Sequence, residues 1–259
     1  MRIALGIEYD GSGFAGWQRQ PHATSVQGAL EKALSRVADH EVTVVCAGRT
    51  DAGVHATAQV VHFETAAART PHSWMFGTNS NLPPEVCVTW AQAVDADFHA
   101  RFSAVGRAYR YIILNRPMRP GLLRNRVSWD YRPLDADRMS EAAQTLIGKQ
   151  DFSSFRALAC QAKHPVREIH ALEVRRSGDF VYLDVAANAF LHHMVRNIAG
   201  VLMTVGAGER PVGWVADVLA ARDRTAGGVT APPGGLYLVQ VRYPARFGIP
   251  QAARLPAFG

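Results

Sequence analysis

The sequence lacks cysteine pairs and long apolar runs, and these absences limit what the protein can be. Its three cysteines, Cys46, Cys87 and Cys160, lie far apart and are odd in number, which excludes a disulfide framework and a zinc knuckle. No run of about eighteen apolar residues is present, so no transmembrane helix is expected. Glu8 and Asp10 stand where a signal peptide would stay apolar. We therefore expect a cytoplasmic protein that does not enter a membrane.

Lysine is also scarce, although the chain is basic. The 28 basic residues outnumber the 22 acidic ones, and the pI is near 9.5, which favours a polyanionic partner. Only Lys32, Lys149 and Lys163 are lysines, and so strong a bias towards arginine also arises from a GC-rich genome. The clustering of basic residues is therefore better evidence for a nucleic-acid partner than their sum.

Apolar periodicity in the first hundred residues predicts the order strand, helix, strand, strand, helix, strand. A Gly-rich loop follows the first strand, and Thr24 and Gln27 have the spacing of a capping box at the start of the first helix. The predicted elements are residues 2–9, 24–38, 42–46, 59–64, 71–82 and 85–94. This β-α-β-β-α-β order indicates a ferredoxin-like α+β fold, with helices on one face of an antiparallel sheet.

The second half repeats these element types without repeating the sequence. We predict strands at 106–115, 126–132 and 235–244, a hairpin around Ser177–Gly178, and helices at 134–148, 189–206 and 212–221, the first capped by Asp135. The fold class is therefore α+β, with two similar halves, each an antiparallel sheet with helices on one face. The predicted domains are residues 1–104 and 105–245, followed by a poorly ordered tail at 246–259.

One acidic residue, Asp51, lies in a loop of small residues between two apolar runs, in "VVCAGRTDAGVHATAQVVHF". Gly48 and Gly53 have the separation of a phosphate-binding loop, but Val54 and His55 follow where Lys and Ser or Thr belong. His55 and His62 are isolated among apolar neighbours, which disfavours a metal site. Taken alone, the "TDAG" segment is best explained by Asp51 capping a short helical turn over 52–58.

The surroundings of this loop favour a functional role. It lies at the end of two Val-rich strands, and its small residues allow a substrate to approach closely. Arg49 is either the ion partner of Asp51 or a residue that points outward to a polyanion. A carboxylate with cationic neighbours stays ionised, which suits a nucleophile or a base.

Basic and aromatic residues alternate in "FHARFSAVGRAYRYIILN", residues 98–115. Three arginines are interleaved with four aromatic residues: Arg101, Arg107 and Arg110 with Phe98, Phe102, Tyr109 and Tyr111. Such a segment can bind phosphates and stack on bases, but a half-buried strand with a solvated basic face has the same pattern. Periodicity does not decide between the two interpretations.

The segment "NAFLHHMVRN", residues 188–197, places one charge in an otherwise apolar helix. Arg196 lies beside the apolar stripe, where a charge is usually paired. His192 and His193 are adjacent on the predicted helix and would point about 100° apart, which disfavours a shared metal. We assign no chemistry to either histidine.

These segments together resemble the tRNA pseudouridine synthase A family. Six of them match in order over essentially the whole chain: "IALGIEYDGSGFAGWQRQ", "AGRTDAGVHATAQVVHF", "FHARFSAVGRAYRYIILN", "DFSSFRA", "NAFLHHMVRNIAG" and "GLYLVQVRYP". The resemblance implies an isomerase that converts uridine to pseudouridine at tRNA positions 38, 39 and 40 in the anticodon stem-loop. It also implies a catalytic cleft between the two halves, and a homodimer that needs no metal and no organic cofactor.

Residue by residue, the resemblance implies that Asp51 is the catalytic aspartate and that Tyr109 stacks on the target uracil. Arg196 matches the arginine that pairs with the aspartate, and Arg49 the arginine that enters the RNA as the base flips out. The other residues expected to contact tRNA are Arg69, Arg101, Arg107 and Arg110. Gly106 and Ala108 stand where other members often carry larger or basic residues, which affects only minor RNA contacts.

The chemistry agrees with one essential carboxylate. Pseudouridine formation breaks the C1′–N1 bond and joins C5 to C1′, so nothing is oxidised and no group is lost. Asp51 would either attack C1′ or remove the 2′ proton to give a glycal, and the sequence does not decide between these routes. A retaining glycosidase would need a second carboxyl about 5 Å away, and none stands out. A non-catalytic RNA-binding protein and an Asp-dependent hydrolase remain as alternatives.

Overall fold

In a computed structural model of the protein, residues 1–258 are described, and they form two compact units. Unit 1 consists of Met1–Val105 and Tyr237–Leu255, and unit 2 of Gly106–Leu236 and the tail from Pro256. The first boundary lies beside the predicted one. The closing strand differs from the prediction, because it was expected in the second domain and nearly all of it belongs to unit 1. Within residues 1–258, no helix is long and apolar enough to cross a bilayer.

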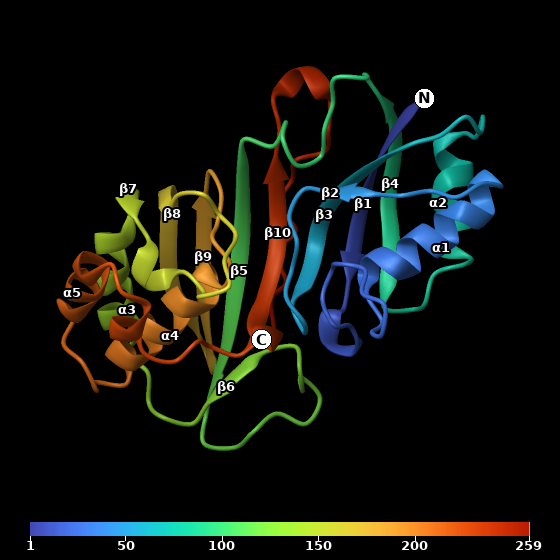
Figure 1. The fold of residues 1–259 in the computed structure, drawn as a ribbon. Coiled ribbons are helices and arrows are strands. Elements are labelled where there is room, and N and C mark those ends of the chain that lie inside the picture. The colour runs from blue at the N-terminus through green and yellow to red at the C-terminus, as the bar shows by residue number, and fades with distance from the viewer. Residues whose placement is uncertain (259) are drawn as a thin grey trace. The chain divides into compact units, whose positions relative to one another are not determined.

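Unit 1 follows the predicted order of elements (Figure 1). These are β1 Arg2–Tyr9, α1 Val26–Ala38, β2 Val45–Cys46, β3 His55–Glu64, α2 Pro71–Asn79 and β4 Val86–Val94, joined by β10 Leu236–Arg242. β1 lies between β4 and β3 and is antiparallel to both. β2 pairs with β3 in antiparallel fashion at His62 and Val61, while β10 runs parallel to β3 at His55 and Ala56. The sheet of unit 1 is therefore mixed, not purely antiparallel.

The core of unit 1 forms where apolar side chains of the helices meet the sheet. Leu30 and Leu34 of α1 are fully buried, and α1 packs against α2, which in turn packs on β4. The rings of Phe63 and Trp74 meet edge to face at 5.1 Å. The cap of α1 is Ser25, whose Oγ accepts a 3.2 Å hydrogen bond from the amide of Gly28. The predicted capping residue, Thr24, was therefore wrong by one position.

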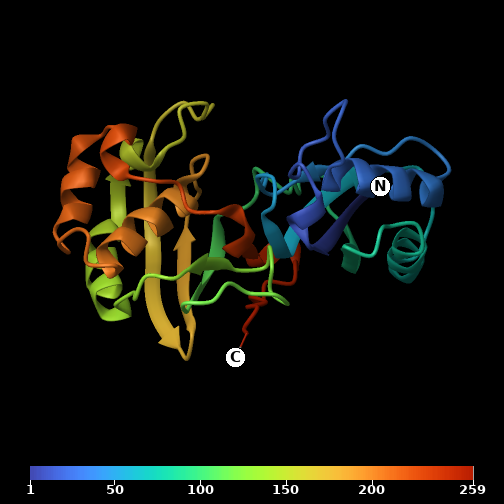
Figure 2. The same cartoon turned by 90° about the horizontal axis from the view of Figure 1, so that it is seen from below.

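Unit 2 contains an antiparallel sheet in the order β5-β9-β8-β7, with the short β6 parallel to β5. Its elements are β5 Gly106–Asn115, β6 Ser128–Asp130, α3 Ala136–Ala143, β7 Gly148–Asp151, β8 Val166–Ser177, β9 Phe180–Ala187, α4 Met194–Gly206 and α5 Trp214–Ala221. The predicted hairpin at Ser177–Gly178 is confirmed. α3 packs on β8 and α4 on β5, so that the helices cover one face of this sheet (Figure 2).

Two predicted helices of unit 2 are shorter than expected. α3 begins after Asp135, as predicted, but gives way after Ala143 to a 3-10 turn, and Gly148 begins β7 with φ at +97°. α4 begins only at Met194, because His193 adopts a left-handed backbone conformation with φ at +62°. The remaining 3-10 turns are Gly11–Gly13, Ser153–Phe155, Arg224–Gly227, Pro233–Gly235 and Ala245–Phe247.

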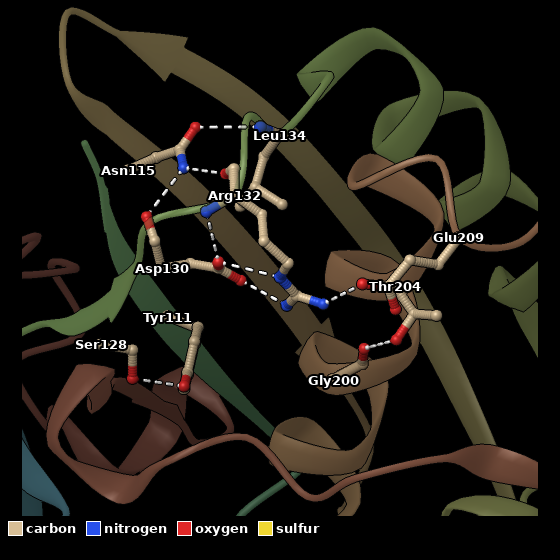
Figure 3. A network of polar contacts seen from close by, with 9 residues as sticks. All are labelled: Tyr111, Asn115, Ser128, Asp130, Arg132, Leu134, Gly200, Thr204 and Glu209. Carbon is tan, nitrogen blue, oxygen red and sulfur yellow. Dashed lines mark hydrogen bonds and ion pairs between the residues drawn. The ribbon is translucent and has the colours of Figure 1, made fainter. Parts of the chain in front are cut away.

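A polar network fixes the connection after β6 to the rest of unit 2 (Figure 3). Arg132 binds the carboxylate of the buried Asp130 with two of its nitrogens and reaches Glu209 at 2.7 Å. These hydrogen bonds raise the pKa of Arg132, so that it remains charged. The side chain of Asn115 donates to the carbonyls of Asp130 and Arg132 and accepts from the amide of Leu134. Side chains thus hold the segment between β6 and α3, where a longer strand had been predicted.

The C-terminal tail differs from the prediction that it is poorly ordered. Arg254 donates its amide to Val239, and its carbonyl accepts from Thr57 at 2.6 Å, both within unit 1. In unit 2, the hydroxyl of Tyr182 donates to the carbonyl of Phe258 at 2.7 Å. Hydrogen bonds to backbone atoms therefore hold the tail at Arg254 and at Phe258.

Candidate active site

The loop that carries Asp51 joins β2 to β3 in unit 1. Asp51 is half-buried and is the first residue of a tight turn, in which the amide of Val54 donates to the carbonyl of Asp51 at 3.1 Å. Gly53 has φ at +76°, as the third position of a type II turn requires. β3 begins at His55, so no helix follows Asp51. The expectation that Asp51 caps a helical turn over 52–58 was therefore wrong.

A second segment, the Gly-rich loop after β1, lies against the backbone of this turn. The amide of Trp17 donates to the carbonyl of Thr50 at 3.0 Å, and the amide of Gly53 donates to Phe14 at 3.4 Å. Gly16 has φ at +94°, and a Cβ there would lie 2.8 Å from the carbonyl oxygen of Thr50. Only glycine allows so close an approach.

Side chains of the sheet hold the other side of the loop. The hydroxyls of Tyr9 and Thr50 are hydrogen-bonded at 2.8 Å in the interior. Gln59, which is fully buried, donates from Nε2 to the carbonyl of Gly48 at 2.7 Å. The backbone on both sides of Asp51 is thus fixed from two directions, which limits where its carboxylate can point.

Three of the predicted tRNA-contacting arginines belong to unit 1, and all three are exposed. Arg69 donates to the carbonyl of Val37 at 3.3 Å, just before α2. Arg49 and Arg101 both act electrostatically on Cys46, at the end of β2. Burial raises the pKa of that thiol to about 11 despite the two arginines, so Cys46 is a neutral neighbour of the Asp51 loop.

Tyr109 lies on β5 in unit 2, opposite Val185 of β9. Its ring is 9% exposed and meets Phe190 edge to face at 5.0 Å. Tyr111, two residues on, is fully buried, contacts Ser128 through its hydroxyl and donates to the carbonyl of Pro232 at 2.8 Å. Burial raises the pKa of Tyr111, while the charge of Arg196 lowers it. Arg196 is therefore close enough to Tyr111 to influence it.

Arg196 is the third residue of α4, and the segment before β10 fixes it. Its Nε donates to the carbonyl of Ala231 at 2.8 Å, and the amide of Ala231 donates back to the carbonyl of Arg196 at 3.1 Å. One turn later, a Cβ at Gly200 would lie 2.0 Å from the carbonyl oxygen of Val229. The residues around 229–231 thus lie directly on α4 and orient the guanidinium.

The polar group beside Arg196 was not predicted from the sequence. Asn197 is 1% exposed, and its side chain donates to the carbonyl of Phe155 and accepts from Thr230 at 2.6 Å and Arg224 at 3.2 Å. The signal was an asparagine in an otherwise apolar helix, because a buried amide needs partners. This group connects the "DFSSFRA" segment to the turn that carries Arg196.

Arg110 does not fit the role that was predicted for it. It was expected to contact tRNA, yet it is 2% exposed and forms a bidentate ion pair with Asp184, directly opposite on β9, at 2.7 and 2.6 Å. Its guanidinium also lies 5.0 Å above the ring of Tyr182. Arg110 is thus a buried structural residue. Arg107 is half-buried and donates to the carbonyl of Asn188 at 3.2 Å.

His192 and His193 precede α4, contrary to the expectation that they lie on it. Their ring centroids are 4.0 Å apart, so the two rings do not diverge as helical neighbours would. The carbonyl of His192 accepts from the amide of Ala157 at 3.0 Å, in the "DFSSFRA" segment. This bond joins two of the motifs, and we still assign the rings no chemistry.

The matches to known proteins cover nearly the whole chain. The family model described as tRNA pseudouridine synthase matches residues 6–103 and 142–244, which is more than half of the chain. A relative from Nitrosococcus oceani, named tRNA pseudouridine synthase A, is 61% identical over 98% of both chains. A relative of the same name from Pseudomonas aeruginosa is 60% identical over 99% of this chain and 90% of that one.

Among solved structures, a chain of a Cbf5-Nop10-Gar1 complex is 13% identical, with a TM-score of 0.35, and covers 91% of this chain and 48% of that chain. This likeness is too weak to carry an argument. The sequence matches are strong by contrast, and they confirm the resemblance that the six motifs indicated. By sequence, the chain belongs to the tRNA pseudouridine synthase family.

Proposed function

We propose that this chain converts uridine to pseudouridine at positions 38, 39 and 40 in the anticodon stem-loop of tRNA. The enzyme class, an isomerase, follows from the family. The observation that supports the proposal most is the position of Asp51. This carboxylate lies on a turn whose backbone is held by Trp17 and Phe14 on one side and by Tyr9 and Gln59 on the other.

Asp51 starts the reaction by one of two routes. It attacks C1′ as the C1′–N1 bond breaks, or it takes the 2′ proton and leaves a glycal. The freed uracil then turns and C5 bonds to C1′. This bond displaces the Asp51 carboxylate from C1′ in the first route, and in the second route Asp51 returns the proton to C2′. The proton lost from C5 balances the one gained at N1. The product has the same atoms and oxidation level as the substrate, and so the reaction needs no cofactor or metal. Both routes need a carboxylate whose direction is fixed, which the braced turn supplies.

Tyr109 and Arg196 are proposed to act on the same uridine as Asp51. The Tyr109 ring stacks on the uracil, which keeps the detached base from diffusing away before it rejoins the sugar. Arg196 pairs with the Asp51 carboxylate and keeps it ionised in a site that excludes water. The two hydrogen bonds between Arg196 and Ala231 support this role, because the one donated by Nε fixes the guanidinium before the substrate arrives.

Arginines that reach the solvent are proposed to bind the tRNA backbone. Arg49, two residues before Asp51, enters the space that the target nucleotide leaves as it flips out of the helix, at a cost of a few kcal/mol. Arg69, Arg101 and Arg107 bind phosphates, whereas Arg110 is buried in an ion pair and is left out. We further propose that the protein is a cytoplasmic homodimer.

The Asp51→Asn variant tests this function. Asparagine keeps the size and the hydrogen-bonding shape of the side chain but cannot act as a nucleophile or a base. The expected result is that tritium release from tRNA carrying [5-³H]uridine falls to background, while tRNA binding stays within about twofold of wild type. Tritium release by the variant would overturn the role of Asp51. Binding of tRNA without tritium release by the wild type would indicate a non-catalytic RNA-binding protein.

A further inference from the structure

Unit 1 carries an exposed aromatic ring that the proposed chemistry does not use. Phe102, in the turn after β4, is 76% exposed. One face of its ring stacks on His99, with 4.3 Å between the centroids and 26° between the planes. The guanidinium of Arg101 lies 5.5 Å from the same ring. A flat ring is thus supported from behind by a second ring and has a positive charge beside it.

The turn that carries this ring is held in place by hydrogen bonds. Nδ1 of His99 accepts from the amides of Arg101 and Phe102 at 3.2 and 3.1 Å. The amide of Ser103 donates to the carbonyl of His99, and the Ser103 hydroxyl accepts from the His99 amide. Ala100, in the same turn, bonds to His62 and to the hydroxyl of Tyr243. The exposed ring therefore loses little conformational entropy when it binds a partner.

The charge around the ring favours an anionic partner. Arg101 acts on Cys46 together with Arg49, and Cys46 lies at the end of β2, where the Asp51 loop begins. Arg49 lies in that loop, and Arg101 follows Ala100, whose amide donates to His62, the residue paired with Val45 of β2. The acidic residue Asp97 is exposed close by in the sequence, but it is paired with Arg246 at 2.9 Å. The positive charge around Phe102 suits a nucleic acid better than an apolar protein surface.

We propose that Phe102 and Arg101 form a stacking platform for a tRNA base that is not the one modified. The base stacks on the exposed part of the Phe102 ring, and Arg101 binds the phosphate next to it. Base stacking on an aromatic ring works for any base, so the platform adds affinity and position without reading sequence. The inference rests on the proposed function, since it takes tRNA as the ligand.

The test compares tRNA binding by variants of Phe102 and of a matched exposed phenylalanine. Phe76 on α2 is 69% exposed and also stacks on a histidine, His72, but α2 packs on β4, at the other edge of the sheet from β2. The probe is an unmodified tRNA transcript, measured by fluorescence anisotropy. Phe102→Ala and Phe102→Leu are both expected to raise Kd about tenfold or more. Phe102→Trp and the control Phe76→Ala are expected to stay within about threefold.

The salt dependence separates the two parts of the platform. Arg101→Ala is expected to lower the slope of log K against log salt by about one, whereas Phe102→Ala leaves that slope unchanged. Phe102→Leu keeps an apolar side chain and serves as the test of stacking if the alanine variant does not fold. If Phe102→Ala and Phe102→Leu both bind tRNA with a Kd within about twofold of wild type, the platform is overturned.

Two further outcomes keep the proposals apart. Dissociation of an oligomer by Phe102→Ala, with the affinity for tRNA retained, would show that the ring is part of a protein interface and would also overturn the platform. Pseudouridine formation by the wild type is measured on the same transcript. If no pseudouridine forms but Phe102→Ala weakens tRNA binding strongly, the isomerase is refuted and the platform is supported. If pseudouridine forms but the Phe102 variants bind tRNA as the wild type does, the isomerase is supported and the platform is refuted.

Discussion

The amide of Trp17 donates a 3.0 Å hydrogen bond to the carbonyl of Thr50, the residue before Asp51. This bond joins the Gly-rich loop after β1 to the turn that carries the carboxylate. The bond is possible only because Gly16, the residue before Trp17, has no side chain that would collide with the Thr50 carbonyl. The geometry of the proposed catalytic residue therefore depends on a glycine 35 positions away in the chain.

Gly16→Ala is expected to lower activity more than stability. The new Cβ would lie 2.8 Å from the Thr50 carbonyl at a φ of +94°, so the turn must move. We expect a loss of about 1–3 kcal/mol in unfolding free energy, and a fall of about a hundredfold in kcat because the carboxylate is misplaced. Gly13→Ala is the control, since its Cβ meets nothing within 4 Å. Equal kcat values for the two variants would refute the bracing role of the loop.

Gly200→Ala is expected to disturb Arg196 from one turn further along the same face of α4. Its Cβ would lie 2.0 Å from the Val229 carbonyl, which displaces the segment that holds the Arg196 guanidinium through Ala231. We expect kcat to fall about tenfold or more, with an overpacking cost of about 1–3 kcal/mol. Gly213→Ala, in open space before α5, should change neither quantity. Tritium-release kinetics and urea unfolding measure both effects.

Arg110→Met is expected to lower stability and not the affinity for tRNA. The variant leaves Asp184 without its bidentate partner inside the sheet. Because Asp184 is about one quarter exposed, we expect a cost of about 2–3 kcal/mol, somewhat less than for a fully buried pair. The double variant Arg110→Met, Asp184→Leu should recover most of it. A weaker affinity for tRNA at unchanged stability would instead restore Arg110 to the RNA-binding surface.

His62 is expected to make the protein less stable in mild acid. Burial, with help from His99 and Arg2, lowers its pKa from 6.5 to about 4, so the folded state keeps it neutral. The unfolded chain binds a proton below pH 6.5 and the folded one does not, so this contribution falls as the pH drops from about 6.5 towards 4. At pH 5 the loss is about 1–2 kcal/mol.

The measurement for His62 is urea unfolding at pH 7 and pH 5. His62→Gln removes the titrating ring and retains an acceptor for the amide of Ala100, which now bonds to Nδ1 at 3.1 Å. The difference in unfolding free energy between the two pH values should shrink in this variant. An unchanged difference would show that His62 is not responsible.

Local elements of the fold could be predicted from the sequence, because they depend on neighbouring residues. Alternation and turn residues identified the hairpin at Ser177–Gly178, and the Asp135 cap has its signal within three positions. The start of α4 was missed because a left-handed histidine, His193, has no distinct pattern in sequence. The parallel pairing of β10 with β3 could not be predicted either, since it joins residues about 180 positions apart.

Some residues of the candidate site could likewise be predicted from the sequence, and others could not. Asp51, Tyr109 and Arg196 were identified by their motifs, and their roles remain predictions. The burial of Arg110 was not foreseen, because its partner Asp184 lies on another strand, 74 residues on. The phenyl ring of Phe102 fitted a core and a surface position equally well. Only the fold shows that it is exposed and stacked on His99.

Mapping pseudouridine in a tRNA transcript treated with the purified protein is the most direct test of the proposed function. The transcript carries uridines at positions 38, 39 and 40 as well as elsewhere, and the positions are mapped after carbodiimide labelling by primer extension. Pseudouridine is expected at these three positions with the wild type, and none with Asp51→Asn. Unmodified uridine at all three positions, or pseudouridine formed equally by the Asp51→Asn variant, would contradict the proposed function.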